Sequence, residues 1–265
     1  MHYTPLQSEM ILQDSSGPIR WMPTGSSHRA ILDKRVYVLD GVTLLELDGV
    51  SPSRFMNPAL EHVQFDDRII AQLSARFPGL RPLTDGGLWE GLVTSITGQA
   101  VSLHSAAAFQ RRLCAMLSTP VTALNREFLA LPSAEKIASC TTEQIKSIGL
   151  TTKRAEGLVN IAREFADGNV PDPPTDKIED WMNDLTQLPM VGPWTAASAL
   201  LWGVGHPDAY PKGDVALLRA ARLAYDDAGM TMKDLDALSE QWRPQRSIAA
   251  RLLWTNLLGM GWDNS

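Results

Sequence analysis

From about residue 65 onward the sequence is a succession of short helical segments separated by turns that contain Gly or Pro. Residues 65–77 place Ile69, Leu73 and Phe77 on one helix face, and residues 88–117 form two expected helices broken near Gly98. Further helices are expected at 133–140, 142–148, 152–167, 176–186, 194–203, 214–227, 232–241 and 245–258. Many short helices with short connections bury their apolar faces as a bundle, so we expect a mainly α fold.

The first 64 residues have a different pattern. In residues 35–49, β-branched and aromatic residues flank Asp40-Gly41, a pair typical of hairpin turns. Gly, Pro and Ser interrupt the rest of this segment. We therefore predict two domains: a small α+β N-terminal domain over residues 1–64, with a small sheet and one or two helices, and a helical domain over residues 65–265.

The composition is that of a folded protein, because 265 residues with 44% hydrophobic and 20% charged residues suffice for a core. The sequence has no apolar run of about 18 residues and no basic-then-apolar start, so we expect a cytoplasmic protein without a membrane span. Cys114 and Cys140 lack a partner motif, which predicts buried thiols and no metal site. A net charge of −6 disfavours binding of nucleic acid through overall electrostatic attraction, but it permits contacts to a few phosphates.

A tight apolar turn, LPMVGPWT, lies at residues 188–195 between two helical segments. Gly192 can adopt a positive φ, and Pro193 suits the first turn of a helix, where its missing N–H costs nothing. Backbone amides at such a helix start favour a phosphate oxygen. The turn alone favours an ordinary helix–helix corner over a phosphate site.

Five motifs follow one another in an order that resembles a known family. They are FPGLRP, LVTSITGQAVS, IGLTTKRAEGL, then LPMVGPWTA followed about twenty residues later by Asp214 in D-x-Y-P-x-x-D, and finally WRPQRSIAARLLW. Together they resemble the helix-hairpin-helix DNA glycosylase superfamily, in its 3-methyladenine DNA glycosylase II branch. The resemblance covers residues 65–258 and implies a helix-hairpin-helix motif within the bundle.

The resemblance implies a monofunctional DNA glycosylase of base excision repair, acting on alkylated purines such as 3-methyladenine and 7-methylguanine after base flipping. Asp214 would be the catalytic carboxylate; the alternative for an aspartate at a helix start is a plain N-cap. Trp194, Trp254 and Ser198 match positions of the base pocket, where Ser198 replaces an aromatic residue. Relatives that also cut the strand carry a lysine at the position of Trp194, so no lyase activity is expected.

The resemblance also implies contacts to double-stranded DNA that contains a damaged base, by a monomeric protein without a cofactor. A monovalent cation at the hairpin loop is compatible with it. Met190 stands where the first hairpin glycine is usual, and Ala100 stands where the family has a bulky wedge residue. Arg243, Arg246 and Lys153 are candidates either for phosphate contacts or for structural contacts. The full set of expected DNA-binding residues is Gln99, Ala100, Met190, Gly192, Thr195 and Lys212.

Two alternatives remain at this point. The first keeps the enzyme class and changes the substrate to deaminated or oxidised bases, which the small Ser198 and Ala100 motivate. The second is a non-catalytic protein that binds DNA structure through the hairpin only, which the acidic net charge and Met190 leave open.

Overall fold

The computed structural model describes residues 22–24, 27–32, 35–40, 43–46, 63–76, 87–118, 121–123, 126–128, 131–170 and 177–262. The helices are α2 (Arg68–Arg76), α3 (Leu88–Gly98), α4 (Leu103–Leu117), α5 (Ala134–Ala138), α6 (Thr142–Lys146), α7 (Thr152–Ala166), α8 (Ile178–Leu185), α9 (Pro193–Ser198), α10 (Val215–Ala224), α11 (Met232–Ser239) and α12 (Arg246–Trp262). A π-helix, η3 (Ala199–Val204), continues α9, and a 3-10 turn, η4 (Glu240–Trp242), follows α11. The mainly α prediction is confirmed for the described part of the chain.

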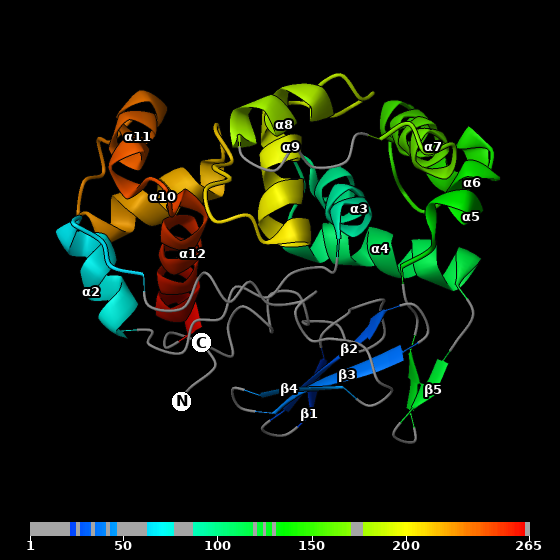
Figure 1. Ribbon diagram of the computed structural model, residues 1–265, viewed down its shortest axis with the longest axis horizontal. Coiled ribbons are helices and arrows are strands. Elements are labelled where there is room, and N and C mark those ends of the chain that lie inside the picture. The colour runs from blue at the N-terminus through cyan, green and yellow to red at the C-terminus, as the bar shows by residue number, and fades with distance from the viewer. Residues whose placement is uncertain are drawn as a thin grey trace.

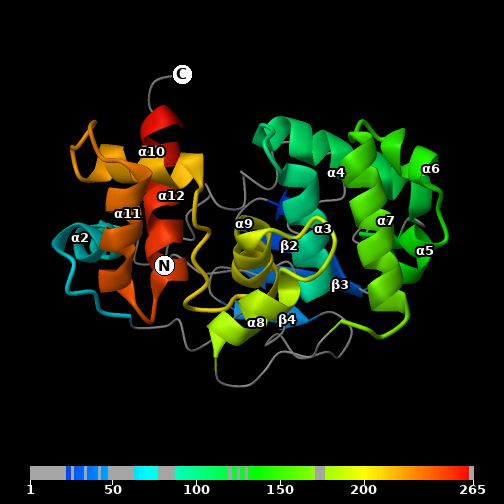
Figure 2. The same ribbon diagram turned by 90° about the horizontal axis from the view of Figure 1, so that it is seen from above.

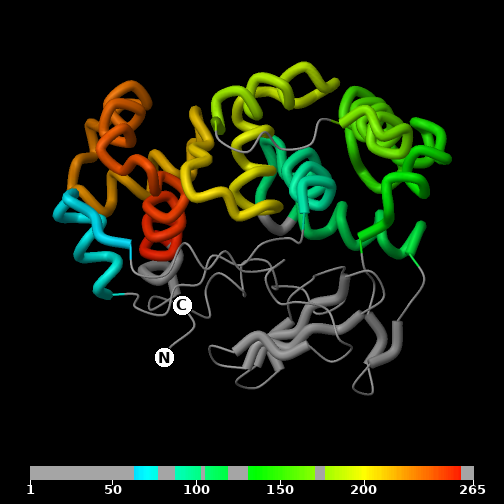
Figure 3. The backbone as a smooth tube through the Cα atoms, viewed as in Figure 1, coloured from blue at the N-terminus to red at the C-terminus, as the bar shows by residue number. Residues whose placement is uncertain are grey.

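The helices form two groups on either side of a central pair, α3 and α9 (Figures 1 and 2). One group contains α10, α11 and α12 together with α2, which comes from the beginning of the helical region but packs on α12. The other group contains α4, α5, α6 and α7. In Figure 3 this group is coloured teal to green, whereas the first group combines the cyan of α2 with the orange and red of α10–α12. Helix α8 packs against α9 and leads into it through the turn at residues 186–192.

The helices begin where the sequence supplies polar caps. Side chains that accept a backbone N–H at a helix start satisfy one of the otherwise unpaired donors there. Thr141 and Thr231 form reciprocal capping boxes at the starts of α6 and α11. The side chains of Ser102, Thr151 and Asp214 each accept one backbone N–H at the starts of α4, α7 and α10, without the reciprocal bond. This explains why helix starts are close to those expected from the sequence.

Helix α3 crosses η3 with the two backbones in contact. A methyl group placed on Gly91 would lie 2.5 Å from the carbonyl oxygen of Ala199 and 2.8 Å from Cα of Gly203. No other residue type fits at this crossing, because any Cβ would enter the opposite backbone. The contact brings the C-terminal end of α3, and with it Gln99, next to the turn that precedes α9.

Helix α2 is tied to the C-terminal group through Asp67. Its carboxylate accepts hydrogen bonds from the Tyr225 hydroxyl (2.5 Å) and from Trp242 Nε1 (3.1 Å). Burial raises the pKa of the Asp67 carboxyl. The hydrogen bonds from Tyr225 and Trp242 and from the backbone N–H groups of Ile69 and Ile70 together lower it by more, so the pKa lies below the ordinary value of 3.8. Asp67 therefore joins α2, α10 and η4.

Four strands precede the helices. They are β1 (Met22–Thr24), β2 (Ser27–Leu32), β3 (Arg35–Asp40) and β4 (Thr43–Glu46), paired antiparallel in sequence order, with Asp40 opposite Thr43. A second antiparallel pair, β5 (Val121–Ala123) with β6 (Arg126–Phe128), follows α4 and was not expected from the sequence. The helices expected within residues 1–64 lie outside the described residues, and the division into two domains at residue 64 stays a prediction. In the part of the chain described, no helix combines the length and apolar character that a membrane span requires.

Candidate active site

Asp214 is the N-cap of α10, and both of its carboxylate oxygens accept hydrogen bonds. Oδ1 accepts the backbone N–H of Leu217 at 2.7 Å, and Oδ2 accepts the indole N–H of Trp194 at 2.8 Å. The carboxylate is partly exposed, so solvent reaches it. The plain N-cap interpretation is therefore correct as far as it goes. The bond from Trp194 is not part of a cap, and it fixes the second oxygen in one direction.

Trp194 is the second residue of α9, so its ring leaves the helix start beside the chain that enters α10. Its side chain is half-buried, and its N–H edge is occupied by Asp214. The ring faces are then the part of the side chain that remains for stacking. Two residues named from the sequence for different tasks, base contact and catalysis, thus form one hydrogen-bonded pair.

The other expected pocket residues lie deeper. Trp254 is 8% exposed, and Ser198 is 3% exposed. Trp254 stacks on Trp202 with ring centroids 5.4 Å apart and an interplanar angle of 25°. The guanidinium of Arg251 lies 4.3 Å from the centroid of the Trp202 ring, a cation–π contact.

Trp202 is not among the pocket residues expected from the sequence, and its stacking on Trp254 was not predicted. The signal was present in the spacing, because positions 194, 198 and 202 recur every four residues along one helical segment. Two expected pocket residues, Trp194 and Ser198, therefore share a helix face with Trp202. The structure forms a Trp202–Trp254 pair and a separate Trp194–Asp214 pair.

The turn before α9 differs from the expectation in one respect. Gly192 has φ −85° and ψ 175°, so it does not use the positive φ that glycine permits. Met190 adopts the left-handed conformation instead, with φ 64°, at the position where a glycine is usual in the resemblance. A non-glycine residue in this region costs about 1–2 kcal/mol, so its surroundings must hold it.

Gln99 connects the end of α3 to this turn. Its side-chain amide donates to the carbonyl oxygen of Met190 (3.2 Å) and to Oγ1 of Thr195 (2.8 Å). Ala100, the next residue, is exposed and also has a positive φ, 50°. Four of the six residues expected to bind DNA, namely Gln99, Ala100, Met190 and Thr195, are thus gathered in one place, and Gly192 lies in the same turn.

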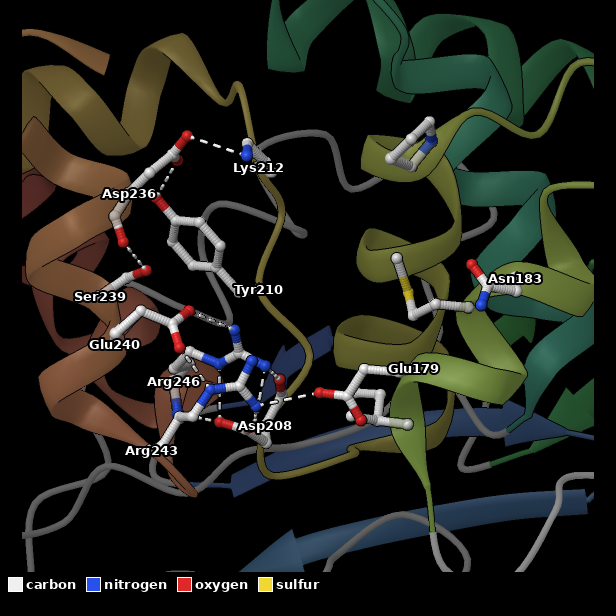
Figure 4. Close-up of a pocket in the computed structure, with 13 residues that line it drawn as sticks. Glu179, Asn183, Asp208, Tyr210, Lys212, Asp236, Ser239, Glu240, Arg243 and Arg246 are labelled. Atoms are coloured by element: carbon white, nitrogen blue, oxygen red, sulfur yellow. Dashed lines mark hydrogen bonds and ion pairs between the residues drawn. The ribbon is translucent and has the colours of Figure 1, made fainter. Parts of the chain in front are cut away.

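Lys212 lies apart from this group, in the segment that leads to Asp214. Its ammonium is 3.4 Å from Asp236 and is strongly exposed. Both residues line a cavity of about 330 Å³ between α8 and α11 (Figure 4). Tyr210 donates from its hydroxyl to Asp236 at 3.1 Å and packs against the core.

Arg243 and Arg246 make structural contacts at the base of the same cavity. Nε and Nη2 of Arg246 each lie 2.8 Å from the carboxylate of Asp208, and both of these residues are buried. Nη1 of Arg243 and the backbone N–H of Arg246 also donate to that carboxylate, at 2.8 and 3.2 Å. The hydrogen bond from Arg243 is also the main reason why the pKa of the Glu240 carboxyl lies below its usual value. Of the two roles considered for these arginines, the structural one is observed.

Comparison with known proteins places these features in a family. Residues 93–244, more than half of the chain, match the HhH-GPD superfamily base excision DNA repair protein family. DNA-3-methyladenine glycosylase 2 of Escherichia coli K12 is 28% identical over 185 residues, which are 70% of this chain and 63% of that protein. DNA-3-methyladenine glycosylase of Bacillus subtilis 168 is 26% identical over 191 residues, 71% of this chain and 63% of that protein. The matched region thus spans less than two thirds of the length of each relative.

A solved structure shows the same fold. The 3-methyladenine DNA-glycosylase from Archaeoglobus fulgidus superposes with a TM-score of 0.72 over 96% of this chain and 94% of that chain, at 19% identity. The resemblance inferred from the five motifs is confirmed by the family match, which contains the hairpin and Asp214. The chain belongs to the HhH-GPD superfamily of base excision DNA repair proteins.

Proposed function

We propose that this protein is a monofunctional DNA glycosylase that removes alkylated purines, such as 3-methyladenine and 7-methylguanine, from double-stranded DNA. The observation that carries the proposal is the hydrogen bond between Trp194 and the partly exposed carboxylate of Asp214. It joins an aromatic ring that can stack on a base to a fixed negative charge that can stabilise positive charge on the sugar. The two bacterial relatives are named as 3-methyladenine glycosylases, which supports the same substrate class.

The chemistry proposed for Asp214 follows from the bond to be broken. An enzyme that acts on a base must first take it out of the stack. As the C1′–N bond breaks, its electrons leave with the base and the sugar gains oxocarbenium character, which a nearby carboxylate stabilises. Water, oriented by the Asp214 carboxylate, then forms the new bond to C1′ and passes its proton to that carboxylate and on to solvent. The products are a free base and an abasic site.

The leaving base needs little further help when it is alkylated. An alkylated purine carries a positive charge, so it departs as a neutral molecule and stacks well on an aromatic face before it departs. Trp194 and Trp254 are the rings proposed for this contact, and Ser198 lies on α9 together with Trp194. The absence of a lysine at position 194 removes the amine needed for a Schiff base, so no strand cleavage is proposed.

The proposed hold on DNA uses the cluster around the turn. Gln99, Ala100, Met190, Gly192 and Thr195 would lie along the backbone of the damaged strand, and Lys212 would add one cation. Leu188 O accepts only Val191 N–H and Met190 O accepts Gln99 Nε2 among the bonds described, so these carbonyls retain lone pairs that suit a monovalent cation. We propose no other cofactor, a monomer as the active form, a cytoplasmic location and a separate α+β domain over residues 1–64.

A second substrate class is supported by a specific observation. Arg251 already places a cation on the Trp202–Trp254 stack, and Ser198 leaves out an aromatic side chain. Both features suit neutral lesions, such as deaminated or oxidised bases, better than a purely aromatic pocket would. Duplexes that each carry one lesion distinguish the two classes, since equal release of neutral and cationic bases would favour the broader range.

The decisive experiment measures release of 3-methyladenine and 7-methylguanine from alkylated duplex DNA. Asp214→Asn keeps the cap to Leu217 but loses the charge, so it should still bind duplex and release base at least about a hundredfold more slowly. Asp227→Asn, a change to an exposed aspartate just after α10, is the matched control and should act like the wild type. Borohydride should trap no covalent complex. Full activity of Asp214→Asn would exclude the mechanism, and binding without release of any lesion would favour the non-catalytic alternative.

A further inference from the structure

The turn that is proposed to hold DNA rests against a notch in a distant helix. Gly157 lies on α7, it is buried, and the side chain of Met190 occupies the space beside its Cα. A methyl group placed on Gly157 would lie 2.7 Å from Cβ of Met190 and closer still to its Cγ. Cβ is fixed by the backbone, so a change of rotamer does not relieve this overlap. The backbone of the turn would have to move.

Met190 is held in its unfavourable left-handed conformation from two sides. The amide of Gln99 fixes its carbonyl oxygen at 3.2 Å, and the notch at Gly157 receives its side chain. A glycine at position 190 would adopt this conformation freely but would fix nothing. The pair of Met190 and Gly157 therefore sets the turn through packing, in place of a flexible glycine.

We infer that Gly157 is a positioning residue that fixes the DNA-binding turn at residues 188–192 through Met190. The inference rests on the proposed function in one respect only, that this turn holds DNA. Gly157 itself is on α7, in the helix group of α4–α7, and it is buried away from solvent. Its effect on DNA is therefore indirect. A turn that is already set in the free protein loses less conformational freedom on binding than a turn that becomes ordered with the DNA.

Three variants test the pair. Gly157→Ala displaces the turn, Met190→Gly removes the side chain that collides, and the double variant has neither the collision nor the anchor. We expect Gly157→Ala to shift the NMR amide signals of residues 188–196 and to weaken binding of undamaged duplex about tenfold, which corresponds to about 1.4 kcal/mol. We expect Met190→Gly to weaken binding less than about threefold. The double variant should return to the level of Met190→Gly, in both signals and affinity.

Asn160→Ala is the matched control, since it changes an exposed residue one turn further along α7 and should alter neither readout. Unfolding curves complete the set, because alanine is otherwise a better helix former than glycine. If Gly157→Ala fails to fold and the double variant folds, the inference is supported. If the loss persists in the double variant, or if Gly157→Ala leaves the amide signals and the affinity unchanged, the inference is wrong.

The two proposals fail in different ways. If the wild type binds duplex but releases no base, the proposed function fails while the affinity series still decides the role of Gly157. If the wild type binds no duplex at all, the amide signals of the turn decide it, because they report the conformation without DNA.

Discussion

At the scale of single residues, the hydrogen bond from Trp194 to Asp214 is the contact that most limits the chemistry. One oxygen of the carboxylate is used by the backbone of α10 and the other by an indole, so the group cannot rotate freely. A charged acceptor makes such a bond worth about 1.5–3 kcal/mol. The orientation of the carboxylate is therefore already set in the free protein.

Trp194→Phe keeps an aromatic ring and removes this bond. Because the carboxylate loses its fixed orientation, we expect single-turnover release of 7-methylguanine to slow by about tenfold or more, with duplex affinity changed less than about twofold. Trp89→Phe is the matched control, since the indole of Trp89 donates to the carbonyl oxygen of Pro132 (2.9 Å) on another part of the fold. An equal loss of affinity and rate in Trp194→Phe would assign the ring to base contact alone.

At the scale of elements, the segment between η3 and α10 is held by the buried ion pair of Asp208 and Arg246. The pair fastens this segment to the first turn of α12, and the segment in turn carries Lys212 and Asp214. Removal of one member of a buried pair leaves the other charge without compensation.

Arg246→Met should therefore lower the free energy of unfolding by about 3–5 kcal/mol. Arg243→Met, at a side chain that is 39% exposed, should cost about 1 kcal/mol. Chemical denaturation measures both values. Adding Asp208→Asn to Arg246→Met should cost less than the sum of the single changes, because the uncompensated charge is then gone. Additive costs would show that the two side chains act independently.

The junction of α2, α10 and η4 at Asp67 predicts a dependence of stability on pH. The pKa of Asp67 is lower in the folded protein than its ordinary value of 3.8, so the carboxylate stabilises the fold. This contribution is complete above pH 3.8 and is lost as the pH falls through the lower, folded pKa. Asp67→Asn should flatten the fall of unfolding free energy in this acidic range, as measured by denaturation at pH 2–5. An unchanged slope would contradict the assignment.

At the scale of the whole molecule, a protein with net charge −6 is proposed to bind a polyanion. The hold proposed at the turn before α9 needs few cations, because backbone N–H groups at a helix start favour a phosphate oxygen. Each phosphate neutralised by a cation steepens the salt dependence of binding by about 0.9 in a plot of log K against log salt. A hold based mainly on amides should therefore be weakly dependent on salt.

We expect this slope to stay below about 4 in magnitude for undamaged duplex, and Lys212→Gln to reduce it by about 1. Fluorescence anisotropy across a salt series measures both. Lys233→Gln, on the exposed side of α11, is the control and should leave the slope unchanged. A slope near 8 would mean that binding depends on a cationic surface outside the residues considered.

The sequence predicted those parts of the fold that depend on local signals. Helix positions, the break after Gly98, the end of α7 shortly before Gly168 and the place of Asp214 follow from periodicity, caps and turn residues. Contacts between distant residues could not be predicted, since Asp208 and Arg246 are 38 residues apart and either could have faced solvent. The positive φ at Met190 instead of Gly192 was missed because it depends on the notch at Gly157, which no local rule describes.

The bond at Trp194 also sets a limit on how this protein can change. If the ring that stacks on the damaged base is also the ring that orients the carboxylate, then the range of bases accepted and the rate of base release both depend on the indole of Trp194. A substitution of Trp194 that admits bulkier bases would therefore lower the rate of release for every base. Variants that broaden the repertoire without this penalty should therefore arise at neighbouring walls such as Ser198, and position 194 should stay unaltered among them.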